Sequence, residues 1–523
     1  MQRARANRSP ARLPGVEPEE PRARAEGAER GAASRGARKG DPASSARQSA
    51  PARGEEEAAR EAARQELVIV ANRLPVRRTT ARDSSDAWAT SPGGLVAALA
   101  PIVRERGGAW VGWSGAPGSA PAPFEAGGIR NLPVTISRAE VTDFYQGQCN
   151  STFWPLYHDA VREPEYHRHW WARYVEVNRR FAEAAAQAAG PWAKVWVHDY
   201  QLQLVPAMLR QIRSDVTIGF FLHIPFPPPE LFRRLPWREE VIDGLLGADV
   251  VGFQTRAARA NFLTVAPRLV AAQREPGGVI YQGRRVGAGA FPISIDVDRF
   301  TKATRSPAVI ERAKALRQSL GGGSRKLILG VDRLDYTKGI DLRLKAFREW
   351  LERPGTSIRD AALVQVAVPS REQIPGYQEL RSRVEELVGQ INGEHGEIGF
   401  AAVHYLRRNL PFEDLVALYR AADVMLVTPL ADGMNLVAKE YVASRPDASG
   451  VLVLSEFAGA VGELRAALLV NPHDVDSLAE TIDQALRLPP REERRRMRSL
   501  INAVESNTVH DWANGYLAAL SSE

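Results

Sequence analysis

Cysteine is almost absent from this chain of 523 residues, in which Cys149 is the single thiol. One thiol forms no intrachain disulfide and no cysteine-ligated metal site, so we expect a reducing compartment and predict a cytoplasmic protein. Long apolar runs are missing as well, because no stretch approaches the roughly 18 uninterrupted apolar residues of a membrane span. The first residues contain no apolar core of the secretory kind, so we expect neither export nor a membrane partner.

Aromatic residues are absent from residues 1–65, which are rich in Ala, Arg, Gly, Glu and Pro. Such a segment buries too little apolar surface to offset its ordering entropy, so we predict a disordered basic tail, with at most a short helix at 55–64. Binding of acidic polymers or a targeting role is the alternative. The tail carries a net charge of +4, which leaves only +3 of the overall +7 for the other 458 residues, so no nucleic-acid partner is expected.

Common catalytic and metal-binding motifs are also missing. The chain has no Gly-x-x-x-x-Gly-Lys-Ser/Thr phosphate loop and no Gly-x-Ser-x-Gly nucleophile elbow. Two Asp-x-Asp pairs, 296–298 and 474–476, look like the metal pair of some sugar-nucleotide enzymes, but one lies at a predicted domain junction and the other precedes a predicted helix. We interpret both pairs as turn and cap residues and predict no metal and no cofactor.

What the chain does contain is an alternation of short apolar runs with helical segments. Runs that predict buried strands lie at 67–70, 194–198, 216–222, 250–253, 327–331, 363–368, 424–427, 451–454 and 468–470. Predicted helices lie between them at 171–188, 203–213, 340–352, 374–393, 412–421 and 477–486. Continuous apolar strands separated by helices predict parallel sheets that are covered on both faces.

The fold class is therefore predicted as α/β, with two Rossmann-like, doubly wound parallel-sheet domains that face a cleft. We place the tail at 1–65, an N-terminal domain at 66–294, a C-terminal domain at 295–500 and a C-terminal helix at 501–523 that crosses back to the N-terminal domain. In such folds ligands bind beyond the carboxyl ends of the strands.

Polar clusters follow six of these predicted strands, at the same topological position in each case. They are Asn72–Arg73, His198–Tyr200, His223–Pro227, Asp332–Gly339, Pro369–Arg371 and Thr428–Tyr441. Six such clusters are hard to explain by packing alone, so we expect their side chains to line one ligand site.

The stretch "TPLADGMNLVAKEY" has the features of an anion site. Gly433 allows close backbone approach, and the helix that follows offers free N–H groups and the positive end of its dipole. Arg333 and Lys338 flank a short loop and are able to neutralise a diphosphate leaving group.

Each of these residues also has an ordinary structural explanation. Asp432 and Asp199 are each suited to capping a helix, and a lone His223 after an apolar strand is often a satisfied core residue. Arg333 and Lys338 are alternatively a pair of surface charges. The residues alone leave these alternatives open.

Taken together, the motifs resemble those of the trehalose-6-phosphate synthases (glycosyltransferase family 20), which are retaining glycosyltransferases of the GT-B architecture. The resemblance spans about Leu67 to Leu517. It is carried by "GGLVAAL", "HDYQL", "FFLHIPFPPPELFRRLP", "DRLDYTKGI", "TPLADGMNLVAKEYVA" and "VLVLSEFAGA".

The resemblance implies roles for the site residues. The catalytic residues would be Asp199, His223, Arg333 and Lys338. The donor-binding residues would be Gly93, Gly94, Arg333, Lys338, Asp432, Gly433, Met434, Asn435, Leu436, Val437 and Glu440. The acceptor-binding residues would be Arg73, Tyr145, Trp154, Tyr200 and Arg371.

By the same resemblance, glucose would pass from UDP-glucose to glucose-6-phosphate with retention and without a metal, in a homo-oligomer. A glucosylglycerol-phosphate synthase, a pseudo-glycosyltransferase that couples cyclitols, and a non-catalytic regulatory subunit stay open as alternatives. A regulatory subunit would be expected to lose Arg333, Lys338 or Glu440, and this chain keeps all three. The donor base, whether UDP, GDP or ADP, also stays open.

Overall fold

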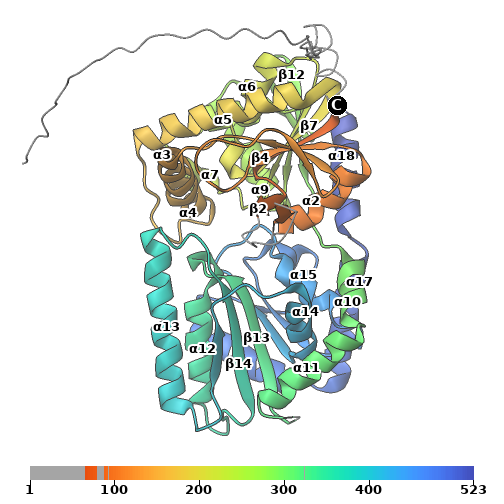
Figure 1. Cartoon of the computed structure of the whole chain (residues 1–523). Helices are drawn as coiled ribbons and strands as arrows, with labels where there is room; N and C mark the ends of the chain where they lie inside the picture. Colours follow the sequence, from red (N-terminus) through yellow and green to blue (C-terminus); the bar gives the residue numbers. More distant parts are fainter. Residues whose placement is uncertain (1–64, 79–87, 92–93, 323, 523) are drawn as a thin grey trace, which may run out of the picture. The chain divides into compact units, whose positions relative to one another are not determined.

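The computed structural model describes residues 65–522 apart from 79–87, 92–93 and 323 (Figure 1). The predicted tail and its short helix at 55–64 lie outside the described residues except for Gln65, and so does Gly93. Within the described part, no helix is both long and apolar enough to cross a lipid bilayer.

The first large sheet has ten strands in the order β10-β11-β12-β9-β8-β7-β1-β4-β6-β5. Its strands are β1 (Gln65–Arg73), β4 (Ala109–Trp113), β5 (Phe124–Ala126), β6 (Ile129–Pro133), β7 (Ala189–His198), β8 (Thr217–Leu222), β9 (Val250–Phe253), β10 (Ala272–Glu275), β11 (Gly278–Tyr281) and β12 (Arg284–Ala290). All neighbouring pairs from β12 to β6 run parallel, whereas β10, β11 and β5 are added antiparallel at the edges.

Helices cover both faces of this first sheet. They are α2 (Gly94–Glu105), α3 (Arg138–Glu140), α4 (Trp154–Tyr157), α5 (Arg168–Ala188), α6 (Val205–Ile212), α7 (Pro229–Phe232), α8 (Arg238–Leu245) and α9 (Arg256–Leu269). The π-helix η1 (Val141–Phe153), the 3₁₀ turn η2 (Tyr200–Leu202) and a small β2–β3 ladder (Val76–Arg78, Trp88–Thr90) complete this part.

Strand β1 shows why the apolar runs are continuous. Ile69 packs into one core with Leu99 of α2, whereas Val68 and Val70 pack into a second core with Phe181 of α5. Both faces of the strand are therefore buried, and burial of each such side chain contributes roughly 1.5–3 kcal/mol.

The second sheet has six strands, all parallel, in the order β15-β14-β13-β16-β17-β18. Its strands are β13 (Lys326–Arg333), β14 (Ala361–Val368), β15 (Val403–Leu406), β16 (Val424–Val427), β17 (Val451–Ser455) and β18 (Leu468–Val470). Its helices and turns are α10 (Val297–Thr304), α11 (Pro307–Ser319), η3 (Tyr336–Lys338), α12 (Ile340–Leu351), α13 (Pro375–His395), α14 (Phe412–Ala421), α15 (Leu436–Ala443), η4 (Gly459–Gly462), α16 (Val475–Leu486) and α17 (Pro490–Glu505).

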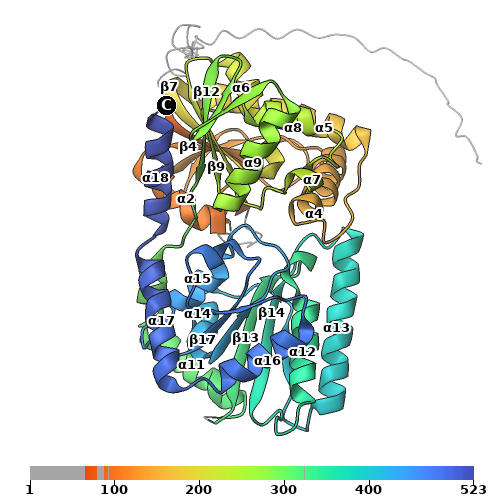
Figure 2. The same ribbon diagram turned by 180° about the vertical axis from the view of Figure 1, so that it is seen from behind.

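The last helix, α18 (Val509–Ser521), packs against the first sheet, as both views show (Figures 1 and 2). The hydroxyl oxygen of Tyr516 lies 3.0 Å from the carbonyl oxygens of Phe220 and of Val250. Gly219 and Gly252 face the same ring, because a methyl group at either position would overlap it. Glycines in β8 and β9 thus make room for one tyrosine of a helix almost 300 residues away.

The predicted α/β class with two parallel sheets is confirmed, and the bounds of β9, β16, β18 and α14 are as predicted. The predicted junction at 294/295 falls in the segment that joins β12 to α10. The parallel strands β4, β6, β12 and β15, the antiparallel edge strands and the π-helix η1 were not predicted. Their apolar residues are few in number or interrupted by glycine and polar residues, so they lack the continuous runs that mark the predicted strands.

Candidate active site

One cavity of about 310 Å³ collects most of the predicted donor and catalytic residues. The predicted residues that line it are Gly94, Asp199, His223, Arg333, Lys338, Asp432, Met434, Asn435, Leu436, Val437 and Glu440. Apart from Gly94 at the start of α2, they lie at or after the carboxyl ends of strands in both sheets, as the topological argument requires. Gly433 does not line the cavity, and Gly93 lies outside the described residues.

Lys338 and Asp432 form the central ion pair of this cavity. The Nζ atom of Lys338 lies 2.6 Å from Oδ2 of Asp432, and the two side chains are only 9% and 14% exposed. Burial alone would raise the pKa of the Asp432 carboxyl, but Lys338 outweighs it and the pKa is lowered. Asp432 is therefore a charged group of the site.

Asn435, not Asp432, caps helix α15. Its side-chain oxygen accepts a hydrogen bond from the backbone N–H of Ala438, and its amide nitrogen donates to Asp432 at 3.0 Å. The interpretation of Asp432 as the helix cap is thus wrong. Asn435 has a φ of 75°, a left-handed conformation that Asn adopts more readily than most residues.

Gly433 lets backbones from the two sheets approach closely. A methyl group on Gly433 would overlap the carbonyl oxygen of His223, which follows β8 of the first sheet. On its other side, a methyl group on Gly459 would overlap the carbonyl oxygen of Gly433. The glycine predicted to serve a ligand also serves this contact between the sheets.

Asp199 lies at the end of β7 with a φ of 75°. Its Oδ1 accepts a hydrogen bond from the backbone N–H of His223 at 3.1 Å, and it caps no helix through its side chain. The alternative that Asp199 is merely a helix cap is therefore wrong. Burial raises the pKa of this carboxyl to about 6, partly opposed by backbone hydrogen bonds and by Arg333. Non-glycine residues with positive φ concentrate at functional sites.

His223 is held by His198, which belongs to a predicted polar cluster, and by Gln254, which was not predicted. Its Nε2 lies 3.1 Å from Nδ1 of His198, and its Nδ1 lies 3.3 Å from Nε2 of Gln254. Burial lowers the pKa of His223 to about 3, so the ring is neutral. The interpretation of His223 as a satisfied core residue is correct for its ring nitrogens, although the residue lines the cavity.

Glu440 lies on α15, where Tyr419 donates a hydrogen bond to its Oε2 at 2.8 Å. Burial raises the pKa of this carboxyl, which Tyr419 and then Arg299 partly counteract. Glu440 also lines a neighbouring cavity of about 400 Å³. The two cavities share Gly94, Leu436 and Glu440, so they adjoin along the start of α15.

The predicted acceptor residues form a second cluster beside the cavity. The guanidinium of Arg371 stacks on the ring of Trp154, with its Cζ 3.9 Å from the ring centroid. Its Nη2 donates to the hydroxyl of Tyr200 at 3.1 Å, and its Nη1 pairs with Asp335 at 3.1 Å. Arg371 has a φ of 49°, another left-handed non-glycine residue at the site.

Arg73 and Tyr145 meet at the ring of Trp113. The Cζ atom of Arg73 lies 4.5 Å from the ring centroid of Trp113, and the ring of Tyr145 contacts the same indole edge-on at 5.9 Å. Asn150 joins the two groups of acceptor residues, because its Nδ2 donates to the backbone carbonyl of Tyr145 at 2.6 Å and its Oδ1 accepts from the hydroxyl of Tyr200 at 2.8 Å. All five predicted acceptor residues are thus brought together.

Sequence reasoning missed several partners of these residues. Asp335 accepts hydrogen bonds from Trp154 at 3.3 Å and from Tyr377 at 3.3 Å, in addition to its pair with Arg371. Its burial is outweighed by the surrounding cations, first Arg371, which lower its pKa to about 2. Asp335 lies inside the quoted motif "DRLDYTKGI", so the sequence could have indicated it as a site residue. Tyr377 lies in none of the quoted motifs.

The two Asp-x-Asp pairs act as predicted. Asp296 accepts a hydrogen bond from the backbone N–H of Arg299 and caps α10, and Asp474 accepts one from Ser477 and caps α16, both at 3.0 Å. Neither aspartate pair lies among the groups of the described residues that have metal-ligand spacing.

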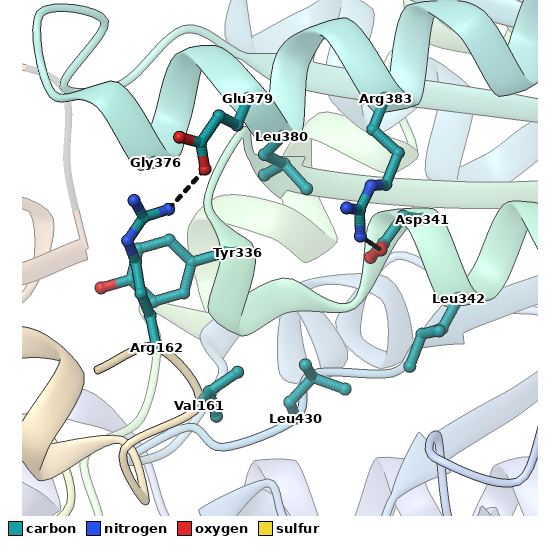
Figure 3. A pocket seen from close by; sticks show the side chains of 10 residues that line it. All are labelled: Val161, Arg162, Tyr336, Asp341, Leu342, Gly376, Glu379, Leu380, Arg383 and Leu430. Carbon is teal, nitrogen blue, oxygen red and sulfur yellow. Dashed lines mark hydrogen bonds and ion pairs between the residues drawn. The ribbon is translucent and has the colours of Figure 1, made fainter. Parts of the chain in front are cut away.

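A separate cavity of about 280 Å³ lies beside Tyr336 (Figure 3). Arg162 pairs with Glu379 at 2.9 Å at one end, and Arg383 pairs with Asp341 at 3.6 Å at the other. Its charged side chains are therefore paired with one another, and no predicted site residue lines it.

Known proteins resemble the chain over nearly the whole described part. The model of Glycosyltransferase family 20 matches residues 65–522. A trehalose-6-phosphate synthase of Mycolicibacterium gilvum is 53% identical over 476 residues, which cover 88% of this chain and 94% of that protein.

Solved structures agree with this relationship. An α,α-trehalose-phosphate synthase (UDP-forming) from Burkholderia xenovorans, in complex with glucose-6-phosphate, has a TM-score of 0.80 at 34% identity and covers 87% of this chain and 100% of its own. An E. coli structure bound with UDP-2-fluoro glucose has a TM-score of 0.79 at 32% identity, with coverages of 87% and 98%. By motif, fold and whole-length similarity, this chain belongs to glycosyltransferase family 20.

Proposed function

We propose that this chain transfers glucose from UDP-glucose to carbon 1 of glucose-6-phosphate with retention, giving α,α-trehalose 6-phosphate and UDP. The observation that supports this most directly is the position of Arg333. It lines the main cavity, and its Cζ lies 5.2 Å from the ring centroid of Trp154 in the acceptor cluster. One cation therefore adjoins both subsites, where a bond between the two sugars would form.

The donor side of the proposal uses the start of α15. The backbone from Gly433 to Val437 would cradle the diphosphate, helped by the helix dipole. Lys338 and Arg333 would neutralise the departing diphosphate, and Asp432 would contact the donor glucose. The Lys338–Asp432 pair supports this, because it holds the cation at the edge of the cavity before a ligand arrives.

We assign the nucleoside to the adjoining cavity of about 400 Å³. Glu440 lines both cavities, which supports a role in which its carboxylate would accept hydrogen bonds from ribose hydroxyls between the diphosphate and the base. The lining of the second cavity includes Leu410, Pro411 and Phe412, which offer apolar surface for a base. Gly93 and Gly94 would lie over the donor.

The acceptor side uses the arginine and aromatic cluster. Arg73 and Arg371 would bind the phosphate, since a guanidinium donates to phosphate in fork geometry. Tyr145, Trp154 and Tyr200 would provide hydroxyls and a stacking face for the hexose. The contacts of Arg371 with Tyr200 and Trp154 support this, because they fix its guanidinium in one orientation.

The reaction would be a front-face displacement. The anomeric hydroxyl oxygen of the acceptor bonds to C1 of the donor glucose as the bond from C1 to the β-phosphate oxygen breaks. The hydroxyl proton passes to the departing phosphate oxygen, on the same face of the ring. Catalysis would rest on positioning and charge stabilisation, in which His223 and Asp199 contact the reacting sugars.

Domain roles and surroundings follow from this assignment. Residues 66–294 would form the acceptor domain, 295–500 the nucleotide-sugar domain, and 501–523 the segment that returns to the first domain. Because Lys338 and Arg333 supply positive charge, we propose that no metal is required, so that a chelator leaves turnover unchanged. We place the enzyme in the cytoplasm, consistent with its single, buried Cys149.

We also propose that the protein is a homo-oligomer. Trp192 is 79% exposed and Ile212 is 49% exposed, and both belong to the part of the chain around β7 and α6. Neighbouring exposed apolar side chains favour protein contacts, and the two segments meet where Arg213, next to Ile212, donates to the carbonyl of Gly190 in β7. Light scattering coupled to gel filtration measures the assembly, and a monomer at all concentrations would refute this part.

The experiment that tests the proposed function is an end-point assay of purified protein with UDP-glucose and glucose-6-phosphate. We expect UDP release and a non-reducing disaccharide phosphate. Activity with glycerol-3-phosphate or a cyclitol phosphate instead would retain the fold and refute the acceptor site. Absence of turnover across a panel of nucleotides and acceptors would favour a regulatory subunit.

A further inference from the structure

A directed chain of hydrogen bonds runs from the main cavity along the carboxyl ends of β9, β8 and β7. The backbone N–H of Ile293 donates to Oε1 of Gln254 at 2.9 Å. A backbone N–H is only a donor, so this contact fixes which end of the Gln254 amide is the oxygen. Its Nε2 must then point the other way, toward Nδ1 of His223 at 3.3 Å.

The amide orientation determines the tautomer of His223. The Nε2 group of Gln254 is only a donor, so Nδ1 of His223 has to be the acceptor and carries no proton. A neutral imidazole has one proton, which therefore lies on Nε2. Burial, which lowers the pKa of His223, keeps the ring in this neutral form.

His198 completes the chain. Nε2–H of His223 donates to Nδ1 of His198 at 3.1 Å, so the proton of His198 lies on its own Nε2. That Nε2 atom is buried and has no hydrogen-bond partner among the described residues. The chain thus starts at a backbone donor, passes through Gln254 and both histidines, and has one direction only.

We propose that Gln254 is a positioning residue that holds His223 in the Nε2–H tautomer, so that its single N–H is shared between His198 and the sugar and the ring never acts as a base. This inference rests on the proposed function for the identity of the sugar that His223 meets. Nε2 of this tautomer has no free lone pair, and Nδ1 is occupied by Gln254. The proton of the acceptor hydroxyl must therefore go to another group, as transfer to the leaving phosphate requires.

The first test is the tautomer itself. The full-length protein, labelled with ¹⁵N at its nine histidines, is observed by proton–nitrogen correlation NMR without ligand. The signals of residues 198 and 223 are assigned by their loss in His198→Asn and His223→Asn. We expect a protonated Nε2 and an unprotonated Nδ1 at both rings, unchanged between pH 6 and pH 8. A protonated Nδ1 at His223 in the wild-type protein would overturn the proposal.

The second test reverses the direction of the hydrogen bonds from residue 254 to His198. In Gln254→Glu, one carboxylate accepts from Ile293 N–H and from Nδ1–H of His223, so the histidine loses its Nε2 proton and gains a titration at higher pH. We expect turnover to fall by about 10²–10³-fold, the scale for losing one hydrogen-bond donor at a reacting centre. Gln273→Glu on exposed β10 makes the same charge change and is expected to leave tautomer and turnover unaltered.

The outcomes separate this inference from the proposed function. A reversed tautomer in Gln254→Glu supports the positioning role even if the wild-type protein makes no disaccharide phosphate, in which case only the proposed function falls. An unreversed tautomer, or full turnover with a reversed tautomer, overturns the inference while the proposed function stands. If Gln254→Glu does not fold, Gln254→Leu replaces it, and a mixture of both tautomers is the expected result.

Discussion

The Nζ atom of Lys338 lies 2.6 Å from a carboxylate oxygen of Asp432, 94 residues further along the chain. The pair joins the turn after β13 to the turn after β16, the two neighbouring strand ends of the second sheet. Asp432 also accepts from Asn435, the cap of α15. One carboxylate therefore fixes both the cation and the helix start that we assign to the diphosphate.

Replacement of this lysine tests the assignment. Lys338→Ala removes the charge that we expect to stabilise the leaving diphosphate, so kcat should fall by about 10²–10³-fold. UDP release at saturating substrates measures the effect. Lys314→Ala, an exposed lysine on α11, is the matched control and should retain wild-type turnover. Intact turnover in Lys338→Ala would show that leaving-group stabilisation has been assigned to the wrong residue.

The raised pKa of Asp199 predicts a pH dependence of activity. Its carboxyl titrates near pH 6, because burial opposes its charge, so kcat/KM should rise as the pH passes through about 6 if the ionised form contacts the sugars. The phosphate of the acceptor also titrates near pH 6. The pH profile of Asp199→Asn distinguishes the titration of the Asp199 carboxyl from that of the acceptor phosphate. If kcat/KM rises by the same amount in this variant, the rise is due to the phosphate alone.

The same shift predicts how stability depends on pH. The folded protein holds the Asp199 proton more tightly than the unfolded chain, so its free energy of unfolding should decrease as the pH rises from 3.8 to about 6. Asp199→Asn removes this ionisation, so it should flatten that part of the curve. Urea unfolding of both proteins from pH 4 to pH 7 gives the comparison, and parallel curves would contradict the predicted shift.

Arg371 tests the acceptor site. Lys cannot reproduce the stacking on Trp154 together with the contacts to Tyr200 and Asp335, so Arg371→Lys should raise KM for glucose-6-phosphate about tenfold or more. The KM for the nucleotide sugar should change little. Arg381→Lys on the exposed face of α13 serves as the control. An equal rise in both KM values would indicate a general loss of structure instead of a lost acceptor contact.

Substitutions at two glycines distinguish the effect of close packing from the effect of helix propensity. Gly433→Ala forces a methyl group against the carbonyl oxygen of His223, so we expect lower turnover and a lower melting temperature. Gly389→Ala, inside α13 and facing open space, should instead stabilise the protein by about 1 kcal/mol. Thermal unfolding and UDP release measure both variants. Wild-type behaviour of Gly433→Ala would mean that the two sheets do not need this close approach.

The sequence by itself determined the nine apolar strands predicted from it and where the chemistry would lie. A run such as Val424–Val427 is apolar at every position because both faces of its strand are buried, so its bounds were readable from hydrophobicity alone. The carboxyl ends of parallel strands meet at one edge of a sheet, so clusters at 199, 333 and 432 were predictable as one site before any distance was known.

The tertiary structure decided which of these groups touch. The order of strands in a sheet, and the approach of one sheet to the other, are not encoded in any local pattern, so the pairing of Lys338 with Asp432 had no signature in the sequence. Gln254 follows a strand, as many other polar residues do. Only its contacts with Ile293 and His223 fix the orientation of its side-chain amide and suggest its proposed role. The periodicity of apolar residues indicates which side chains are buried. The direction of a hydrogen bond depends instead on partners that only the folded chain brings together.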